Sequence, residues 1–239
     1  MTALIKGELI KTVSTRTLLG YAVTGVALAI ANVVIVTQFS GDLDTVSDKQ
    51  EAIAGLPIVV LLFGLVGAAG EYRHRTAAPA ALAAGRDRAL LLLARTGAYA
   101  LTGVAVGALM VAVALVLGLP LLAAHPEPGL GSHNVALVVG GSLIAAALSA
   151  IIGVAVGALV RNQVAGVVGA LILAFVVSPL IAVIDETAVE FTPFGAAFAL
   201  AGDPQAGTLS WGGDALLLVA WTVPLMIAAI IAERRRDLA

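Results

Sequence analysis

Six long apolar stretches constrain the fold of this 239-residue chain more than any other feature. A helix needs roughly 20 apolar residues to cross a bilayer core about 30 Å thick. Backbone polar groups cannot stay unpaired in lipid, so continuous apolar runs of this length are predicted to be helices. The sequence therefore predicts an all-α membrane protein with six transmembrane helices. These spans cover about 17–39, 52–70, 96–120, 135–160, 164–184 and 214–232.

The composition agrees with a lipid-embedded chain and excludes several kinds of site. Apolar residues make up 60% and charged residues 12%, against about 45–50% and about 25% in soluble domains. The net charge of −2 gives no basic face for a nucleic acid. The absence of cysteine excludes a disulfide framework, a thiolate-ligated zinc and a thiol nucleophile. We expect residues 1–239 to form a single transmembrane domain.

The basic residues sort to one side of the predicted membrane. Of the 13 lysines and arginines, 12 fall before the first span, between the second and third, between the fourth and fifth, or after the sixth. Lys49 alone falls on the other side. The positive-inside rule assigns the basic side to the cytoplasm. Because an odd number of spans would scramble this sorting, six spans with both termini in the cytoplasm are predicted.

Two segments on the basic side are predicted to be short helices outside the bilayer core. Residues 3–16 carry Ile5, Leu9 and Val13 at helical spacing, which predicts an N-terminal interfacial helix. The loop 71–95 contains an alanine-rich stretch at 76–85. Thr76 is a candidate N-cap and Gly85 a candidate terminator of a short surface helix there.

The loop between the fifth and sixth spans contains a third such segment, at 191–201. It is too apolar for a solvated loop and too short to cross a bilayer. Thr192 followed by Pro193 is typical of an N-cap and first helical position. We expect a re-entrant or interfacial helix on the outer side.

Small residues at helical spacing predict close packing between spans. The heptapeptide Gly-Val-Ala-Val-Gly-Ala-Leu occurs at 103–109 and again at 153–159. Each copy holds a GxxxG pair, which lets two helix backbones approach closely. Gly64, Gly67 and Gly70 in the second span have the same predicted role. Tyr72 and Tyr99, near the cytoplasmic ends of their spans, are predicted interfacial anchors.

The spans carry little chemistry of their own. The sequence has no phosphate-binding loop of the type G-x-x-x-x-G-K-[ST] and no H-E-x-x-H zinc motif. No ionisable residue falls near the middle of a span, which argues against an ion-coupled pathway. Thr24, Asn32 and Ser178 are neutral polar groups in spans; they either line a substrate path or form interhelical hydrogen bonds.

One outer loop contains His125, Glu127 and His133, which are potential metal ligands. Their spacing matches no standard zinc site, and the loop is rich in glycine and proline. We therefore expect a solvated loop and no metal there.

The loop 71–95 also has a pattern that is similar to a known transporter family. It begins Glu-Tyr-Arg-His-Arg-Thr at 71–76, continues with the short helix and closes on a basic residue at the third span. With six spans and an interfacial helix before the first, the chain resembles the permease (transmembrane) subunit of a type-2 ATP-binding-cassette (ABC) transporter. Arg75 stands where that family often has glycine, and Gly85 where it often has proline. The positions that match the family's loop are Glu71, Arg73, Thr76, Leu82, Gly85, Arg86, Arg88 and Arg95.

The resemblance implies a coupling helix at 76–85 that contacts a separate ABC ATPase subunit. A short surface helix held between rigid spans can pass a rigid-body movement from a soluble partner to the membrane domain. The alternative is that the loop arginines fix topology and contact anionic lipid. The residues implied in ATPase coupling are Glu71, Arg73, Arg75, Thr76, Leu82, Gly85, Arg86 and Arg88.

The same resemblance implies the protein's setting. The chain is expected to be no enzyme and to hold no cofactor, with ATP and magnesium bound by the partner ATPase. A homodimer or a heterodimer with a second permease is expected, at a two-fold interface formed partly by the first, second and fifth spans. The implied function is export of an apolar or amphipathic substrate across the plasma membrane of a bacterial-type cell. The alternative is a non-transporting membrane scaffold or accessory subunit whose basic loop binds another cytoplasmic protein.

Overall fold

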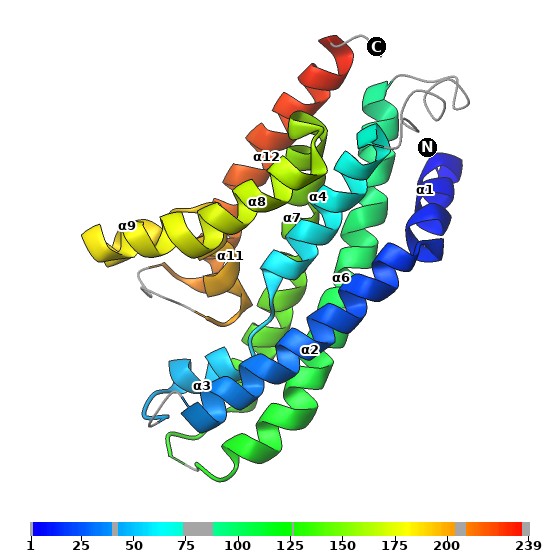
Figure 1. Cartoon of the computed structure of the whole chain (residues 1–239). Coiled ribbons are helices and arrows are strands. Elements are labelled where there is room, and N and C mark those ends of the chain that lie inside the picture. The colour runs from blue at the N-terminus through cyan, green and yellow to red at the C-terminus, as the bar shows by residue number, and fades with distance from the viewer. Residues whose placement is uncertain (1, 40–42, 74–87, 126, 204–208, 236–239) are drawn as a thin grey trace.

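The computed structural model describes residues 2–39, 43–73, 88–125, 127–203 and 209–235. Within these ranges the chain is helical, with turns and short connections but no strand. Six helical stretches are long and apolar enough to cross a membrane (Figure 1). The fold is therefore that of an all-α, multi-pass membrane protein, as the sequence predicts.

All six expected spans are helical, and several extend beyond their predicted bounds. The first is α2 (Arg16–Phe39) and the second is α3 (Val46–Ala52) followed by α4 (Pro57–Arg73). The third is α6 (Arg88–Leu122) and the fourth α7 (Ser132–Val160). The fifth runs through α8 (Gln163–Ile172), the π-helical turn η1 (Leu173–Val177) and α9 (Ser178–Ile184). The remaining helices are α1 (Thr2–Ser14), α10 (Glu186–Glu190), α11 (Pro193–Ala201) and the sixth span α12 (Trp211–Arg235).

The second span is not the continuous helix 52–70 that the sequence predicts. It breaks between Ala52 and Pro57, since Pro57 begins α4 and proline favours an extended residue before it. The amide of Gly55 in this break donates to the hydroxyl of Ser142 at 3.1 Å and to the carbonyl of Ala201 at 3.2 Å. The Ser142 hydroxyl in turn donates to Ala201 at 3.0 Å. Partners from α7 and α11 thus satisfy backbone groups that the break frees inside an apolar bundle.

The segment 191–201 contains the predicted helix, and this helix is packed into the bundle. The Thr192 hydroxyl accepts a hydrogen bond from the amide of Gly195, which confirms the predicted N-cap. The buried residues of α11 contact α7 and α12. They are Phe194, Gly195, Ala196, Ala197, Leu200 and Ala201.

The centre of the bundle is a close contact between α4 and α7. Gly64 of α4 faces the backbone of Ala150, and Gly153 of α7 faces the backbone of Leu61. A Cβ atom built on Gly157 would lie only 2.6 Å from the carbonyl oxygen of Leu65. The two backbones therefore approach so closely that no larger side chain fits between them, as predicted from the small residues.

The first GxxxG pair has a similar role between α6 and α7. A Cβ on Gly103 would lie 2.9 Å from the Cβ of Ala150, and one on Gly107 would lie 2.7 Å from that of Ala146. The two heptapeptides thus pack α6 against α7 and α7 against α4. Gly70 does not share this role, because a Cβ there would meet no atom within 4 Å.

The outer helices leave wide apolar faces uncovered. In Figure 1, α8, η1 and α9 run away from the central helices, and α2 follows the opposite flank. Of the six candidate spans the α3–α4 stretch is the most buried, whereas α8–α9 is the least. Exposed residues on these outer helices include Leu19, Val23, Phe39, Phe175, Val183 and Ile184.

The N-terminal helix α1 and the ends of α4, α6 and α12 that border the charged segments lie at one end of the bundle. Both chain termini reach this end in Figure 1. α3 and the turn between α6 and α7 lie at the other end. The described helix ends that carry basic residues in α1, α4, α6 and α12 therefore lie at one end of the structure.

We expect Gly153→Ala to lower the free energy of unfolding by about 1–3 kcal/mol, because the added methyl group forces α4 and α7 apart. Thermal unfolding of the purified chain in detergent measures the effect. Gly70→Ala is the matched control in α4, and removing a helical glycine there should stabilise by about 0.5–1 kcal/mol. Equal effects of the two substitutions would contradict the close contact.

Candidate functional site

The base of the loop 71–95 is held by a group of four charges, three of them buried and the fourth exposed. Glu71, in the last turn of α4, accepts hydrogen bonds from Lys11 of α1 and from a terminal guanidinium nitrogen of Arg95 in α6. Glu8 of α1 lies 3.6 Å from the Nε of Arg95 and 3.4 Å from the Nζ of Lys11. We call Glu8, Lys11, Glu71 and Arg95 the basal charge cluster.

The basal charge cluster has two acidic and two basic side chains, and three of the four are buried. Glu8, Glu71 and Arg95 are 7%, 6% and 3% exposed, and Lys11 is the member that remains accessible. Two carboxylates against two cations balance the charge. Burying such charges costs desolvation free energy, which their mutual attraction offsets. Removing one member therefore leaves another charge buried without its partner, which is strongly destabilising.

The next residue along α4 forms a second contact group. Tyr72 donates a hydrogen bond to Glu233, near the end of α12. Arg161, the left-handed C-cap of α7, donates to the same carboxylate at 2.9 Å. The Arg161 guanidinium also lies over the Tyr72 ring, 4.6 Å from its centroid, in cation–π geometry. We call Tyr72, Arg161 and Glu233 the tyrosine cluster.

One turn of α4 therefore ties together most of this end of the bundle. Glu71 reaches α1 and α6, and its neighbour Tyr72 reaches the end of α7 and α12. The loop leaves α4 after Arg73 and re-enters the described structure at Arg88, the first residue of α6. The point where the loop begins is thus fixed to four other helices.

A hollow of about 370 Å³ lies beside the basal charge cluster. Its wall includes Lys11, Glu71, Tyr99 and Gln163, together with Thr12 and Thr15. The hollow is half open, so Lys11 can be reached from outside the bundle. It lies between α1 and α4, beside their contact through Lys11 and Glu71.

Only some of the predicted coupling residues belong to the described part of the structure. Glu71 is buried in the basal charge cluster. Arg73 is exposed at the end of α4, with its Nη1 3.5 Å from the Gln163 side-chain oxygen, and Arg88 is half-buried at the start of α6. The helix predicted at 76–85 lies outside the described residues, as do Arg75, Thr76, Leu82, Gly85 and Arg86.

Sequence reasoning missed Glu8, Lys11 and Glu233 as members of the site. The apolar stripe of 3–16 predicts an apolar contact face, yet α1 packs on α6 with its polar side. Glu8 and Thr12 are buried, whereas Ile10 and Val13 are more than half exposed. The available signal was the i, i+3 spacing of Glu8 and Lys11, two opposite charges on one helix face.

The two tyrosines predicted to anchor the spans make protein contacts instead. Tyr99 is buried and packs against Phe63 with ring centroids 5.0 Å apart, so its assignment as an interfacial anchor is wrong. Tyr72 belongs to the tyrosine cluster. Both contacts depend on how distant helices pack around α4. No local feature of the sequence indicates that packing.

The three polar residues proposed for a substrate path occupy separate positions. Asn32 donates to the backbone carbonyl of Glu51 at 2.9 Å, which ties α2 to α3. Ser178 donates to the carbonyl of Leu173 at 2.9 Å, within the π-helical turn that precedes Pro179. Thr24 is on an exposed face of α2. For Asn32, the hydrogen-bonding role given as the alternative is the one observed.

The three potential metal ligands do not form a site. Among the residues that the structure describes, no three histidine, aspartate or glutamate side chains gather in a metal-binding group. His125 contributes its backbone carbonyl to Lys49, whose Nζ also donates to the carbonyl of Pro128 at 2.6 Å. Lys49 is 1% exposed and thus pins the turn between α6 and α7.

Comparison with known proteins adds no further assignment. No protein-family model matches the chain, and no curated protein sequence matches it. The class that the fold defines is therefore the multi-pass, six-helix membrane protein, with a charged loop base as its candidate site.

We expect Glu71→Gln and Arg95→Met each to lower the free energy of unfolding by about 3 kcal/mol, because each leaves a buried charge without its partner. The double variant should lower the free energy of unfolding by clearly less than the sum of the two single effects. Chemical unfolding in detergent micelles measures all three. The control Glu186→Gln, an exposed acid in α10, should change stability by less than about 0.5 kcal/mol. If the two single effects simply add in the double variant, the Glu71–Arg95 ion pair is contradicted.

Proposed function

We propose that the chain is the transmembrane permease subunit of an ABC transporter, driven by ATP hydrolysis on a separate ATPase subunit. The observation that carries the proposal is the fixed base of the loop 71–95. A lever that passes movement from a soluble partner to the bundle must be anchored firmly at its base. Glu71 and Tyr72, one residue apart, join that base to α1, α6, α7 and α12.

The exposed faces of the outer helices support a two-fold assembly. α2 and α8–α9 present large apolar side chains, which either face lipid or pack against a second permease subunit. The second span is covered by the rest of the chain, so the interface is proposed to use α2 and α8–α9 without it. Both a homodimer and a heterodimer fit these faces.

The substrate proposed on these grounds is apolar or amphipathic, because the exposed faces carry mostly alanine, valine, leucine and isoleucine. Export from a bacterial-type cell, with the protein in the plasma membrane, follows from the resemblance to the transporter family. ATP and magnesium would be bound by the ATPase, and this chain contributes the pathway and the coupling loop.

The orientation is open to a direct test, because the chain has no native cysteine. We expect a membrane-impermeant maleimide added to intact cells to label Thr208→Cys and to leave Ala80→Cys unlabelled. Permeabilised cells should label both. Labelling of Ala80→Cys in intact cells would place the charged loop outside and remove the basis for coupling to a cytoplasmic ATPase.

Copurification tests the proposed function. The chain purified in mild detergent from its own host should bring with it a stoichiometric ABC ATPase, identified by mass spectrometry. Replacing residues 76–85 with a Gly/Ser linker should remove the ATPase. Replacing residues 204–208, in the sequence between α11 and α12, is the matched control and should retain it. If no ATPase appears in detergents or in nanodiscs, the scaffold alternative is favoured instead.

A further inference from the structure

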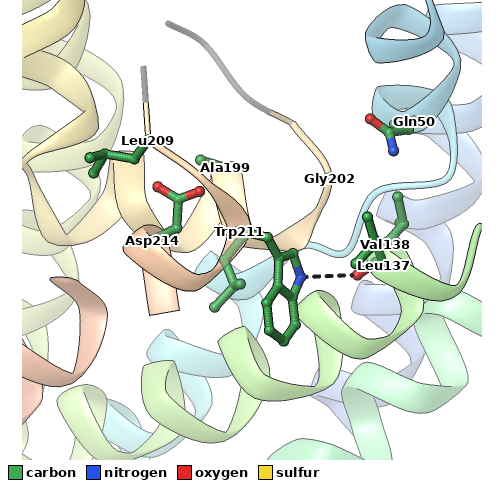
Figure 2. Close-up of a pocket in the computed structure, with 9 residues that line it drawn as sticks. Gln50, Leu137, Val138, Ala199, Gly202, Leu209, Trp211 and Asp214 are labelled. Atoms are coloured by element: carbon green, nitrogen blue, oxygen red, sulfur yellow. Dashed lines mark hydrogen bonds between the residues drawn. The ribbon is translucent and has the colours of Figure 1, made fainter. Parts of the chain in front are cut away.

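Two pockets of the described structure differ in their charge. The pocket beside Trp211 (Figure 2) has a mostly apolar wall, in which Asp214 is the only charged residue among those described. Another pocket, of about 290 Å³, lies where α4 ends beside the turn from α7 to α8. Its described wall holds two guanidinium groups and no carboxylate, so it suits an anion. We call it the arginine pocket, and its wall consists of Arg73, Arg161, Asn162, Gln163 and Val164.

Arg73 gives the arginine pocket a positive charge. The side chain is exposed at the end of α4, and its Nη1 lies 3.5 Å from the side-chain oxygen of Gln163. Within the described part of the chain, Arg73 forms no ion pair with a carboxylate. The contact with a neutral amide orients the guanidinium but leaves its charge unbalanced.

Arg161 is the more firmly held of the two arginines. Its backbone has φ 54°, a left-handed conformation that residues other than glycine rarely adopt. Its Nη2 donates to Glu233 at 2.9 Å, and the guanidinium lies over the ring of Tyr72. A guanidinium carries five N–H donors, so the bond to Glu233 does not exhaust its capacity. Since Glu233 balances the charge of Arg161, the pocket is left with about the one positive charge of Arg73.

The wall of the arginine pocket continues into an apolar face of α8. Val164, in the wall, is 64% exposed, and Val168, one turn further along α8, is 47% exposed. Leu171 follows at the spacing that keeps side chains on one face of a helix, and it is also exposed. The span that begins with α8 is the least buried of the six. A cationic pocket therefore adjoins a stripe that is suited to lipid chains.

This combination matches an amphipathic anion with a phosphate head group. Guanidinium groups bind phosphate oxygens through paired, charge-assisted hydrogen bonds. Basic pockets between membrane-spanning helices bind the head groups of anionic lipids. A phosphodiester such as that of phosphatidylglycerol carries one negative charge, which equals the charge left on the pocket. In phosphatidylcholine a quaternary ammonium cancels that charge.

We propose that the arginine pocket binds the phosphate of an anionic glycerophospholipid, with Arg73 and Arg161 as donors and an acyl chain along Val164 and Val168. The lipid uses the first turns of α8, so η1 and α9 stay available for the subunit interface proposed above. Lipid binding is measured on this chain alone and does not rest on ATPase coupling. A failure of one proposal therefore leaves the other untouched.

Native mass spectrometry of the chain in detergent measures lipid binding directly. Phosphatidylglycerol and phosphatidylcholine with identical acyl chains are titrated separately, and the ratio of their apparent dissociation constants gives the preference. One arginine near the surface strengthens binding of an anionic lipid about fivefold. The parent should therefore prefer phosphatidylglycerol by about fivefold or more. Inorganic phosphate at the same concentration should not displace the lipid, because it has no chain to contact α8.

Two variants of the arginine pocket have matched controls. Arg73→Gln should lower the preference about fivefold, whereas Arg16→Gln, at an exposed arginine that begins α2, should leave it unchanged. Gln163→Glu adds a carboxylate to the wall and should abolish the preference. Because Gln163 is the first residue of α8, a negative charge there favours the helix and the variant should fold. Gln38→Glu, at an exposed position near the end of α2, adds the same charge elsewhere and should retain the preference.

Equal binding of the two lipids by the parent would overturn the proposal. So would an effect of Arg16→Gln as large as that of Arg73→Gln, which would show that surface charge as a whole attracts the lipid. Displacement of phosphatidylglycerol by inorganic phosphate would identify a site for free anions and would overturn the lipid as ligand. If Arg73→Gln does not fold, as judged by circular dichroism, Gln163→Glu decides the outcome, and an unchanged preference in that variant contradicts the site.

Discussion

The backbone contact between α4 and α7 is the interaction on which the rest of the structure depends. Gly64, Gly153 and Gly157 let these helices meet without intervening side chains, and the remaining spans pack around them. In lipid there is no hydrophobic force to drive helices together, so van der Waals contact of this kind and interhelical hydrogen bonds supply the association. The break before Pro57 is tolerated because Ser142 of α7 and Ala201 of α11 satisfy the freed backbone.

Because α4 lies at the centre of the bundle, it can hold the start of the loop 71–95 in place. The helix that is held most firmly in the bundle carries Glu71 and Tyr72 in its last turn, immediately before the loop. The basal charge cluster and the tyrosine cluster therefore connect the loop base to α1, α6, α7 and α12. The outer helices α2 and α8–α9 have little of their surface fixed by the chain, and they are free to meet lipid or a partner.

The sequence predicted the six spans and helices at 3–16 and 191–201, which the structure has as α1 and α11, because apolar runs and N-cap residues are local signals. It also predicted the packing role of Gly103, Gly107, Gly153 and Gly157. Local signals do not predict three other features. These are the break in the second span, the buried position of Tyr99 and the polar contact face of α1. Each depends on which residues of distant helices come into contact, as Glu71 does with Arg95 and Asp214 with Glu190.

Rigidity of the loop base is measured most directly by the distance between spin labels on its two sides. Arg73→Cys at the end of α4 and Leu93→Cys near the start of α6 are both at exposed positions in a chain without native cysteine. Double electron–electron resonance in nanodiscs should give one narrow distance distribution, which broadens when Glu71→Gln is added. A distribution equally broad with and without Glu71 would contradict a base held by the basal charge cluster.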